Sequence, residues 1–584
     1  MPLYQQHLEA LRNAFPAPVS DPVHDGYVVF SLLRTLDRVD ALKSQAPILG
    51  VPREPDYAAA ATAVLANDPQ PLEKVIPQLV DCLNGMLIVA HPRSQVNVVA
   101  PPSIASVIGT VLPSMYNPNL CSDESGRGFS EAEVRVASIA AQLVGYDSQK
   151  SGGVFTFGGT GTLLYGLKIG LEKALPGTFD RGLWSEGSAL GSCRPAATAS
   201  PSQARISPSQ AGASPSQNLR SPVILCSDRG HYACASVAAW LGLGQQNVVR
   251  VASKRDNSID ITALEAAARE QLEQGKPIAA IVATLGTTDA FGLDDLATIY
   301  ALRQRLSDEF HLPYKPHIHA DAVIGWAWSV FDDYSFAENP LGFRGRTVRA
   351  LAAAVSRVQH LRLADSIGID FHKTGFAPYI SSLLLVRDRA DFGLVARQRE
   401  TMPYLYHTGQ YHPGMFTLET TRSATGVMAA LANLLLLGKE GLRTLIGHAV
   451  EMAEVLRELI ASRPELSTLN DQNFGPVTLF RAYPGGVDTF RVHDRERSDP
   501  SFAADLERHN DLNRRIYQRV AAEAYAGRGV AIGFTDNYGL SATGQPICAL
   551  KSYVLSPFAS EDQMHAVIEH VLAALKAEEA GAAS

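Results

Sequence analysis

The sequence predicts an α/β protein, with a large domain built on a mostly parallel sheet and a small α+β domain after it. From about residue 134 onward, short apolar runs rich in β-branched residues alternate with longer helical stretches, which is typical of βαβ units. The runs are apolar throughout, as expected of strands buried on both faces of a sheet. After a long helical stretch near residues 423–459, the pattern changes to strands that would pair antiparallel and be packed by helices.

Each predicted element follows from this alternation. The large domain is predicted to contain six strands, at residues 154–157, 223–225, 278–283, 318–320, 366–369 and 382–386. The first 85 or so residues read as helices with turns between them, for example at 57–66 and 71–86. In the small domain we expect strands at 477–481, 489–492, 530–534 and 549–554, and helices at 506–525 and 561–575.

Three segments follow from these elements. We expect an N-terminal helical segment at 1–115, a large domain at 116–438 and a small C-terminal domain at 439–584. Residues 185–221 interrupt the large domain with a Ser-, Pro-, Ala- and Gln-rich stretch that contains SPSQ three times. Proline in each copy prevents a continuous helix, so this stretch is predicted to be a low-complexity surface insertion.

Composition excludes several classes of protein. The 584 residues are 46% hydrophobic and 19% charged, which is typical of a globular protein with a filled core. A net charge of −8 argues against nucleic acid or an anionic membrane surface as the main partner. No apolar run approaches the ~20 residues of a membrane span, and no secretory signal is recognisable. Six scattered cysteines predict reduced thiols and a cytoplasmic protein.

Polar or small residues follow four of the predicted strands. They form the segments GGTGT (158–162), DRGH (228–231), HADAV (319–323) and DSIGIDFHKTG (365–375). Because the carboxyl ends of parallel strands meet at one edge of a sheet, these segments are expected to converge on one crevice.

The glycine-rich segment indicates an anion site. Gly159, Thr160 and Gly161 follow a predicted strand and begin a helix, whose first amides can bind a phosphate. A dinucleotide site is an alternative, but the next glycine, Gly166, is too far along for the GxGxxG pattern. A helix-capping turn without any ligand is the other alternative.

The segment His317–Asp321 has two interpretations. His317, His319 and Asp321 resemble the start of a binuclear zinc site, although no second cluster of ligands with suitable spacing is recognisable. Alternatively, Asp321 is a single carboxylate presented by the end of a strand.

Lys373 is the most informative residue. A lysine that ends an apolar strand is costly to bury, and burial is expected to lower its pKa and make its amine nucleophilic. A lysine that extends to the surface is the alternative. A phosphate site, a buried acid, a histidine and an imine-forming lysine together are what pyridoxal phosphate requires.

With these residues the chain resembles the group II pyridoxal-phosphate-dependent amino-acid decarboxylases, which include glutamate, aromatic amino acid and tyrosine decarboxylases. The resemblance runs from about residue 91 to 575. It rests on six segments in the family's order: GGTGT, HYA at His231, ATLGTTDAFGLDDL from Ala283, HADAV, DFHKTG, and PYL…TL..TRS from Pro403 to Ser423. It implies the type I fold of pyridoxal-phosphate enzymes, pyridoxal 5'-phosphate as cofactor and an amino acid as the small-molecule substrate.

The resemblance also implies a role for each residue. Lys373 would hold the cofactor through an imine, Asp321 would pair with its pyridine nitrogen, and His231 would stack on its ring. Thr288 would lie near its phenolic oxygen. The phosphate would be held by Gly159, Thr160, Gly161, Ser366 and His372.

In the family, a tyrosine on a loop of the partner subunit supplies the proton that Cα takes up after carbon dioxide leaves. Tyr404 matches that position, with Tyr406 and Tyr411 as alternatives, and a tyrosine there favours simple decarboxylation over aldehyde formation. The resemblance therefore also implies a homodimer whose subunits share the active site, with the N-terminal segment exchanged between them.

Three positions depart from the family pattern. Val323 stands where relatives usually have alanine beneath the ring, and Phe371 stands where they have proline or another small residue. Glu419 and Thr420 stand where relatives often have glycine. Cofactor binding is expected to remain intact, whereas these side chains are expected to change the shape of the substrate pocket.

Other functions remain open at this stage. Another pyridoxal-phosphate-dependent carbon–carbon lyase, an aminotransferase or an aldehyde-forming decarboxylase would use the same cofactor. A metal-dependent hydrolase would use His317, His319 and Asp321, and a decarboxylase-like protein with weak or no turnover is a third possibility. Among substrates, the resemblance favours an aromatic amino acid such as tyrosine, followed by an acidic one.

Overall fold

The computed structural model describes residues 2–12, 14–175, 221–402 and 406–583. Nearly all of the insertion predicted at 185–221 lies outside the described residues, as does Tyr404. The chain divides into two compact units, one of Ala100–Glu451 with Asn470–Pro476, the other of Met1–Val99, Met452–Leu469 and Val477–Ser584. The three segments expected from the sequence stay a prediction.

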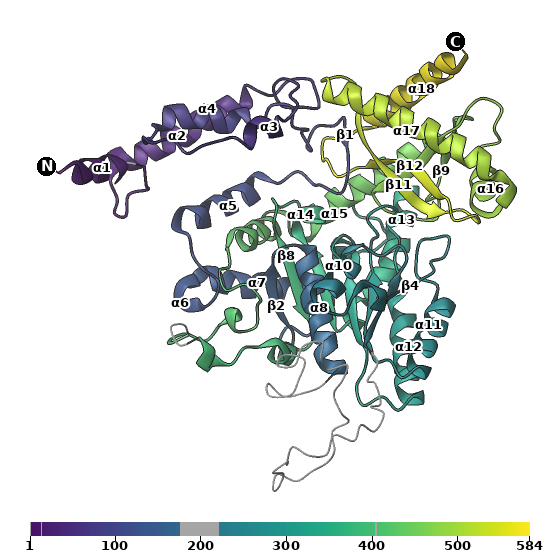
Figure 1. Ribbon diagram of the computed structural model, residues 1–584, viewed down its shortest axis with the longest axis horizontal. Helices are drawn as coiled ribbons and strands as arrows, with labels where there is room; N and C mark the ends of the chain where they lie inside the picture. Colours follow the sequence, from purple (N-terminus) through teal and green to yellow (C-terminus); the bar gives the residue numbers. More distant parts are fainter. Residues whose placement is uncertain (1, 13, 176–220, 403–405, 584) are drawn as a thin grey trace, which may run out of the picture. The chain divides into compact units, whose positions relative to one another are not determined.

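The unit of residues 100–451 is built on a seven-stranded sheet of order β2-β8-β7-β6-β5-β3-β4 (Figure 1). Five strands, from β4 to β7, are parallel, and β8 pairs antiparallel with both β7 and β2. The strands are β2 (Gly152–Thr156), β3 (Val223–Ser227), β4 (Val248–Val251), β5 (Ile278–Thr284), β6 (His317–Asp321), β7 (Ser366–Asp370) and β8 (Ser382–Val386). The predicted mostly parallel α/β sheet is confirmed.

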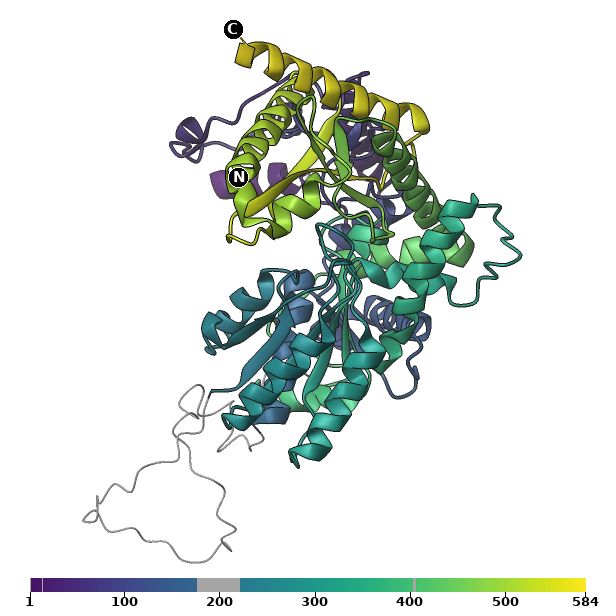
Figure 2. The same ribbon diagram turned by 90° about the vertical axis from the view of Figure 1, so that its right-hand side faces the viewer.

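Helices cover both faces of this sheet (Figures 1 and 2). Every residue of β3, β5, β7 and β8 is buried, which explains why these strands read as continuous apolar runs. The helices are α5 (Ile104–Tyr116), α6 (Asp123–Gly126), α7 (Gly128–Leu143), α8 (Gly159–Ala174), α10 (Ala233–Trp240), α11 (Ile261–Glu273), α12 (Leu296–Glu309), α13 (Gly345–Val358), α14 (Phe371–Thr374) and α15 (Thr425–Ala461). Helix α15 is broken at Gly438, which has a φ of 55°, and its last turns belong to the second unit.

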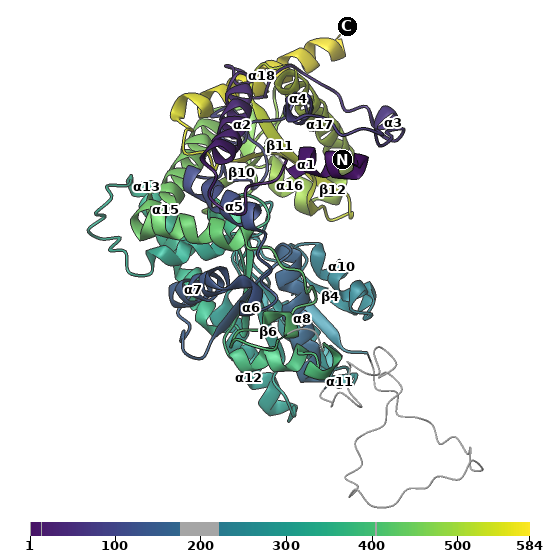
Figure 3. The same cartoon turned by 90° about the vertical axis from the view of Figure 1, so that its left-hand side faces the viewer.

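The second unit contains a five-stranded sheet of order β1-β11-β12-β10-β9. Its strands are β1 (Ser94–Gln95), β9 (Leu466–Thr468), β10 (Val477–Ala482), β11 (Ala531–Leu540) and β12 (Pro546–Tyr553). Helices α17 (Ala503–Tyr525) and α18 (Glu561–Ala583) pack side by side against the sheet (Figure 3). Apolar side chains such as Ile516, Leu550 and Val567, which are fully buried, form the core between them.

The predicted strand at 489–492 is wrong. The backbone N–H of Val492 donates to the carbonyl oxygen of Asp488 at 2.9 Å, and the Asp488 side chain accepts from the N–H of Phe490 at 3.2 Å. This turn leads into the short helix α16 (Val492–Ser498). An aspartate that bonds to the amides after it favours a turn over a strand.

The first residues of this unit form the helices α1 (Leu3–Arg12), α2 (Pro22–Asp40), α3 (Tyr57–Ala60) and α4 (Leu72–Asp81). Helix α3 is much shorter than the helix expected at 57–66. In the described part of the chain, no helix has the length and apolar character that crossing a membrane requires.

Candidate active site

A cavity of 180 Å³ lies at the carboxyl ends of β5, β6 and β7, and we call it the strand-end cavity. Its position confirms that the polar segments after these strands converge. Fourteen described residues line it: Gly159, Thr160, Leu163, His231, Ala233, Thr284, Gly286, Thr287, Thr288, Asp321, Val323, Asp370, His372 and Lys373. Seven of the residues predicted from the sequence are among them, namely Gly159, Thr160, His231, Thr288, Asp321, His372 and Lys373.

The glycine-rich turn joins β2 to α8 at the edge of this cavity. Gly158 has a φ of 122°, a conformation that favours glycine, and α8 begins at the next residue. The amides of Gly159 and Thr160 belong to the first turn of α8, where no intrahelical acceptor exists for them. Gly161 does not line the cavity, because its Cα faces Thr156, and a Cβ there would lie 2.9 Å from the Thr156 side chain.

Lys373 extends into the cavity from α14, the single turn of helix that follows β7. Its Nζ lies 2.9 Å from Oδ2 of Asp370. Burial tends to lower the pKa of Lys373. The carboxylate of Asp370, with a smaller contribution from Asp321, raises the pKa by more, so it lies above its ordinary value. The expected lowering of the lysine pKa is therefore wrong, because a buried carboxylate stabilises the ammonium form.

Asp370 is the site residue that the sequence interpretation missed. Its side chain is almost fully buried, accepts a hydrogen bond from Ser382 Oγ at 2.5 Å and lies beside Gly159. A signal was present in the sequence, since Asp370 and Lys373 are three residues apart at the end of one strand. Residues three apart on one turn of helix face the same side.

Asp321 ends β6 and lines the cavity. Burial raises the pKa of its carboxyl group, while Lys373 and His231 act in the opposite direction. The cavity thus holds two carboxylates, from the ends of the neighbouring strands β6 and β7, and the lysine interacts electrostatically with both.

Two histidines contribute rings to the cavity wall. Burial lowers the pKa of both His231 and His372, which favours their neutral forms. Nδ1 of His231 accepts a hydrogen bond from the N–H of Ala233 at 3.1 Å. Tyr232 packs on the His231 ring with centroids 4.2 Å apart, and Tyr379 packs on His372 at 4.5 Å.

The structure does not bring Ser366 to the cavity. Ser366 begins β7, is fully buried, and its Oγ lies 2.7 Å from Nε2 of His317 and 2.8 Å from Nδ1 of His319. Burial lowers the pKa of both histidines to about 3, so both are neutral near pH 7. The two histidines are therefore bridged by a hydroxyl group rather than directed at Asp321. Among the described residues, no group of three His, Cys, Asp or Glu side chains is placed to hold a metal ion.

The residues that line the strand-end cavity fit the expected pyridoxal phosphate. Oγ1 of Thr284 is buried in the wall without a hydrogen-bond partner in the described part of the chain, so a ligand group can satisfy it. Gly286, which has a φ of 107°, lines the same wall. The first amides of α8 suit a phosphate, and the Asp321 carboxylate suits a protonated ring nitrogen.

The candidate tyrosines lie elsewhere. Tyr404 is outside the described residues. Tyr406 is buried against His412, with ring centroids 5.1 Å apart, and Tyr411 donates its hydroxyl hydrogen to Oε2 of Glu133 at 3.1 Å. Neither Tyr406 nor Tyr411 lines the strand-end cavity.

The departures from the family pattern have different consequences. Val323 lines the cavity, and its Cγ1 is close to Gly159 and Gly368, so the extra methyl groups occupy space there. Phe371 instead packs in the core, stacked on Phe155 with centroids 6.0 Å apart and edge-on to Trp326 at 4.8 Å. Only Val323 can therefore affect the cavity directly.

Sequence comparison connects this geometry to known proteins. Residues 196–482 match the sequence model of the pyridoxal-dependent decarboxylase conserved domain. The chain is similar to an L-2,4-diaminobutyrate decarboxylase of Acinetobacter baumannii, at 26% identity over 84% of this chain and 81% of that protein. It is also similar to an L-tyrosine decarboxylase of Enterococcus faecium, at 25% identity over 57% of this chain and 58% of that protein.

The fold is shared with a solved structure. The Oryza sativa TDC, solved with PLP and tryptamine, superposes with a TM-score of 0.71, at 17% identity over 96% of this chain and 100% of that one. The predicted type I fold and the predicted family are both confirmed. Residues 196–482 therefore carry the pyridoxal-dependent decarboxylase domain, and the chain is a pyridoxal-phosphate-dependent amino-acid decarboxylase.

Proposed function

We propose that the strand-end cavity is the site where an L-amino acid loses its carboxyl group to give an amine and carbon dioxide. The observation that carries this proposal is that Lys373 contacts the buried carboxylate of Asp370 and interacts electrostatically with the half-buried Asp321, in a cavity that the glycine-rich turn also lines. Pyridoxal phosphate, when bound, supplies an electron sink for the electron pair of the broken bond.

Each residue has a distinct task in this proposal. Lys373 would hold the cofactor covalently. Asp321 keeps a proton on the ring nitrogen, which maintains the electron sink. His231, whose neutral form is favoured by burial, covers one face of the ring. The amides of Gly159 and Thr160, together with His372, bind the phosphate, and Thr288 contacts the phenolic oxygen.

A proton must be returned to Cα after carbon dioxide leaves. We assign this task to Tyr404. The two alternatives are less suitable, because Tyr406 is buried and the hydroxyl of Tyr411 is bonded to Glu133.

Asp370 is expected to control the protonation of Lys373. Replacing Asp370 with asparagine removes the charge that raises the lysine pKa but leaves the burial that lowers it. The amine must be neutral to attack the cofactor aldehyde. The pH at which cofactor attachment to the apoprotein becomes fast should therefore fall by about one unit in this variant. The measurement is the rate at which visible absorbance appears, recorded as a function of pH.

Asp228→Asn is the matched control, because Asp228 is an exposed carboxylate at the end of another strand of the same sheet. It should leave the pH profile unchanged. An unchanged profile in Asp370→Asn, or a shift to higher pH, would show that Asp370 does not set the lysine pKa.

For the substrate, we propose an L-amino acid with a cationic side chain, of which L-2,4-diaminobutyrate is the first to test. The support is the Acinetobacter baumannii relative, whose similarity spans more of this chain than that of the tyrosine decarboxylase. An aromatic amino acid such as tyrosine is the second candidate. Two exposed aromatic rings, Tyr232 and Tyr379, pack on the histidines of the cavity and favour it.

Carbon dioxide release from L-2,4-diaminobutyrate, L-tyrosine, L-glutamate and the D-enantiomers separates these candidates. We expect the highest kcat/KM with L-2,4-diaminobutyrate and no release from D-amino acids. Faster turnover of L-tyrosine would transfer the proposal to aromatic substrates, and no release from any amino acid would overturn the proposed function.

We further propose that the protein is a homodimer. Helix α5 exposes a row of large apolar side chains that a second copy can cover: Ile104, Val107, Ile108, Val111, Leu112 and Met115. Helix α2 has no buried residue and exposes a similar row. Continuous apolar surfaces of this kind are typical of subunit interfaces. Under this proposal, the segment 1–115 takes part in the interface between the subunits.

A further inference from the structure

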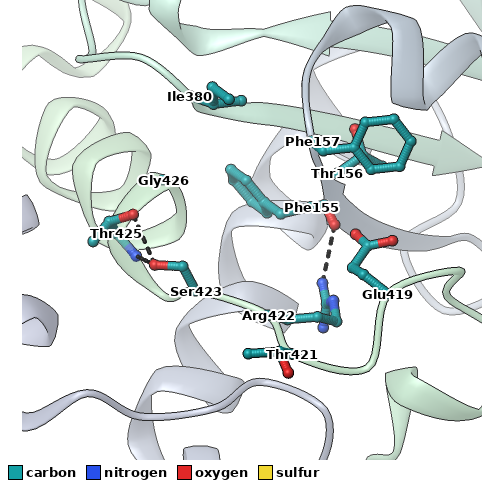
Figure 4. Close-up of a pocket in the computed structure, with 10 residues that line it drawn as sticks. All are labelled: Phe155, Thr156, Phe157, Ile380, Glu419, Thr421, Arg422, Ser423, Thr425 and Gly426. Atoms are coloured by element: carbon teal, nitrogen blue, oxygen red, sulfur yellow. Dashed lines mark hydrogen bonds between the residues drawn. The ribbon is translucent and has the colours of Figure 1, made fainter. Parts of the chain in front are cut away.

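A second cavity, of 290 Å³, has residues 155–157 in its wall, directly before the turn that carries Gly158, and we call it the Glu419 cavity. Figure 4 shows the ten residues that line it, which come from the end of β2, the segment before β8, and the segment 419–426. Thr156 links this wall to the glycine-rich turn, because Oγ1 of Thr156 donates to the carbonyl oxygen of Gly158 at 3.0 Å. None of the tasks proposed above uses this cavity.

Glu419 and Arg422 are the charged residues among these ten, and the charge of Arg422 is already balanced. Arg422 forms a buried ion pair with Glu133 and donates to the carbonyl oxygens of Leu120 at 2.7 Å and Phe155 at 3.0 Å. Burial tends to lower the pKa of Arg422, but Glu133 more than offsets this, with a smaller contribution from Glu419, so the pKa is raised and the guanidinium is permanently charged. The arginine is thus neutralised by Glu133, which leaves the carboxylate of Glu419 as the unbalanced charge of the cavity wall.

A hydrogen bond from Tyr165 fixes the orientation of the Glu419 carboxylate. The Tyr165 hydroxyl donates to its Oε2 at 2.6 Å and accepts from the N–H of Leu418 at 2.5 Å. Burial, and then the nearby Glu419, raise the pKa of Tyr165, so the phenol keeps the proton that it donates. Among the described residues, Tyr165 is the side chain that donates a hydrogen bond to this carboxylate, and it does so to Oε2. Oε1 can therefore accept a hydrogen bond from a ligand.

The rest of the wall suits an organic cation. The ring of Phe157 lines the same cavity (Figure 4) and packs against Tyr165 with centroids 6.4 Å apart, and aromatic rings attract ammonium groups. Thr421 also lines the cavity, whereas Oγ of Ser423 already accepts a hydrogen bond from the N–H of Thr425 at 3.2 Å. A carboxylate fixed by Tyr165, with the Phe157 ring in the same wall, suits a primary ammonium group.

We propose that the Glu419 cavity binds the ammonium group of an aliphatic amine, with Glu419 as its charged partner. Two sources provide this chemistry in a decarboxylase: the amine that it releases, and a cationic side chain of its substrate. The proposal rests on the proposed function only for the choice of these molecules as probes. An amine bound next to the turn that presents Gly159 would then make the affinity for the cofactor depend on the concentration of the amine.

The first test is calorimetric titration with propane-1,3-diamine. The protein is first reduced with borohydride, which fixes the cofactor on Lys373, so the diamine cannot displace that lysine. We expect binding that weakens about tenfold or more in Glu419→Gln and also weakens as salt is added, because an ion pair is lost or screened. Propan-1-ol, which carries no charge, should not bind.

Glu338→Gln is the matched control, since it removes the same charge from an exposed position outside the cavity. Tyr165→Phe retains the carboxylate and removes the hydroxyl group that orients it, so it should weaken binding by a smaller factor. It also provides a second test if Glu419→Gln unfolds. Equal binding by wild type and Glu419→Gln, or no binding by wild type, would overturn the proposal.

Kinetics distinguish the two sources of the ammonium group. A higher KM for L-2,4-diaminobutyrate in Glu419→Gln, with kcat and the KM for L-tyrosine unchanged, would identify the substrate side chain. Loss of inhibition by propane-1,3-diamine at an unchanged KM would identify the released amine. If neither changes, neither molecule uses the cavity during turnover, and the assignment of these two sources fails. Diamine binding by a protein that decarboxylates no amino acid would instead overturn the proposed function and leave this inference intact.

Discussion

Replacing Lys373 with alanine should remove the covalently bound cofactor and lower the rate of decarboxylation by about a thousandfold or more. Lys373 is the lysine that lines the strand-end cavity, and it lies within hydrogen-bond distance of Asp370. Without its amine the cofactor can bind only non-covalently, and the substrate must react with a free aldehyde. The measurement is carbon dioxide release, together with the visible spectrum before and after borohydride.

Lys150→Ala is the control, since Lys150 is an exposed lysine of the same unit. It should leave both the spectrum and the rate unchanged. A borohydride-sensitive visible band that survives in Lys373→Ala would mean that another lysine holds the cofactor, and the assignment of Lys373 would fail.

Replacing Asp321 with asparagine should lower kcat by about a hundredfold to a thousandfold while the cofactor stays bound. An amide matches the carboxylate in shape but cannot stabilise a proton on the ring nitrogen, so the electron sink is weakened. Because Lys373 and the glycine-rich turn are intact in this variant, cofactor occupancy should remain close to that of the wild type. Both quantities are measured on the same sample, kcat from carbon dioxide release and occupancy from visible absorbance.

Measuring occupancy separates this effect from simple loss of the cofactor. If occupancy falls in proportion to kcat, Asp321 acts mainly in binding. A kcat within about twofold of wild type at full occupancy would contradict a role for Asp321 in the chemistry.

Much of the fold follows directly from the sequence. The strands of the large sheet are buried on both faces, so continuous apolar runs mark their positions to within two or three residues. Strand β4 was missed because it is short, lies at the edge of the sheet and contains the exposed Arg250. An edge strand gives a weaker apolar signal than a central one.

The candidate site was predictable where position along a strand determines where a side chain lies. Asp321 and Lys373 follow the ends of parallel strands, and such ends meet at one edge of the sheet. Ser366 lies at the opposite end of β7, four residues before Asp370, so it could not reach the same cavity. The sign of the Lys373 pKa shift depends on the distance to Asp370, which no sequence pattern gives.

The Glu419 cavity could not be predicted from the sequence for the same reason, since no sequence pattern gives the distances between its side chains. In the sequence, Glu419 stands out only as a departure from the family pattern, because the residues that contact it lie in distant segments. Tyr165, which orients it, is 254 residues away in the sequence, and Glu133, which neutralises Arg422, is 289 residues from that arginine. Only the folded chain brings these groups together.

The central claim is that Lys373 in the strand-end cavity holds the cofactor. Borohydride reduction of the purified protein, followed by proteolysis and mass spectrometry of the peptides, tests it most directly. We predict that the visible band disappears on reduction and that the added pyridoxyl mass is found on the peptide containing Lys373. A protein that cannot be loaded with the cofactor, or a modification on a different lysine, would contradict the account.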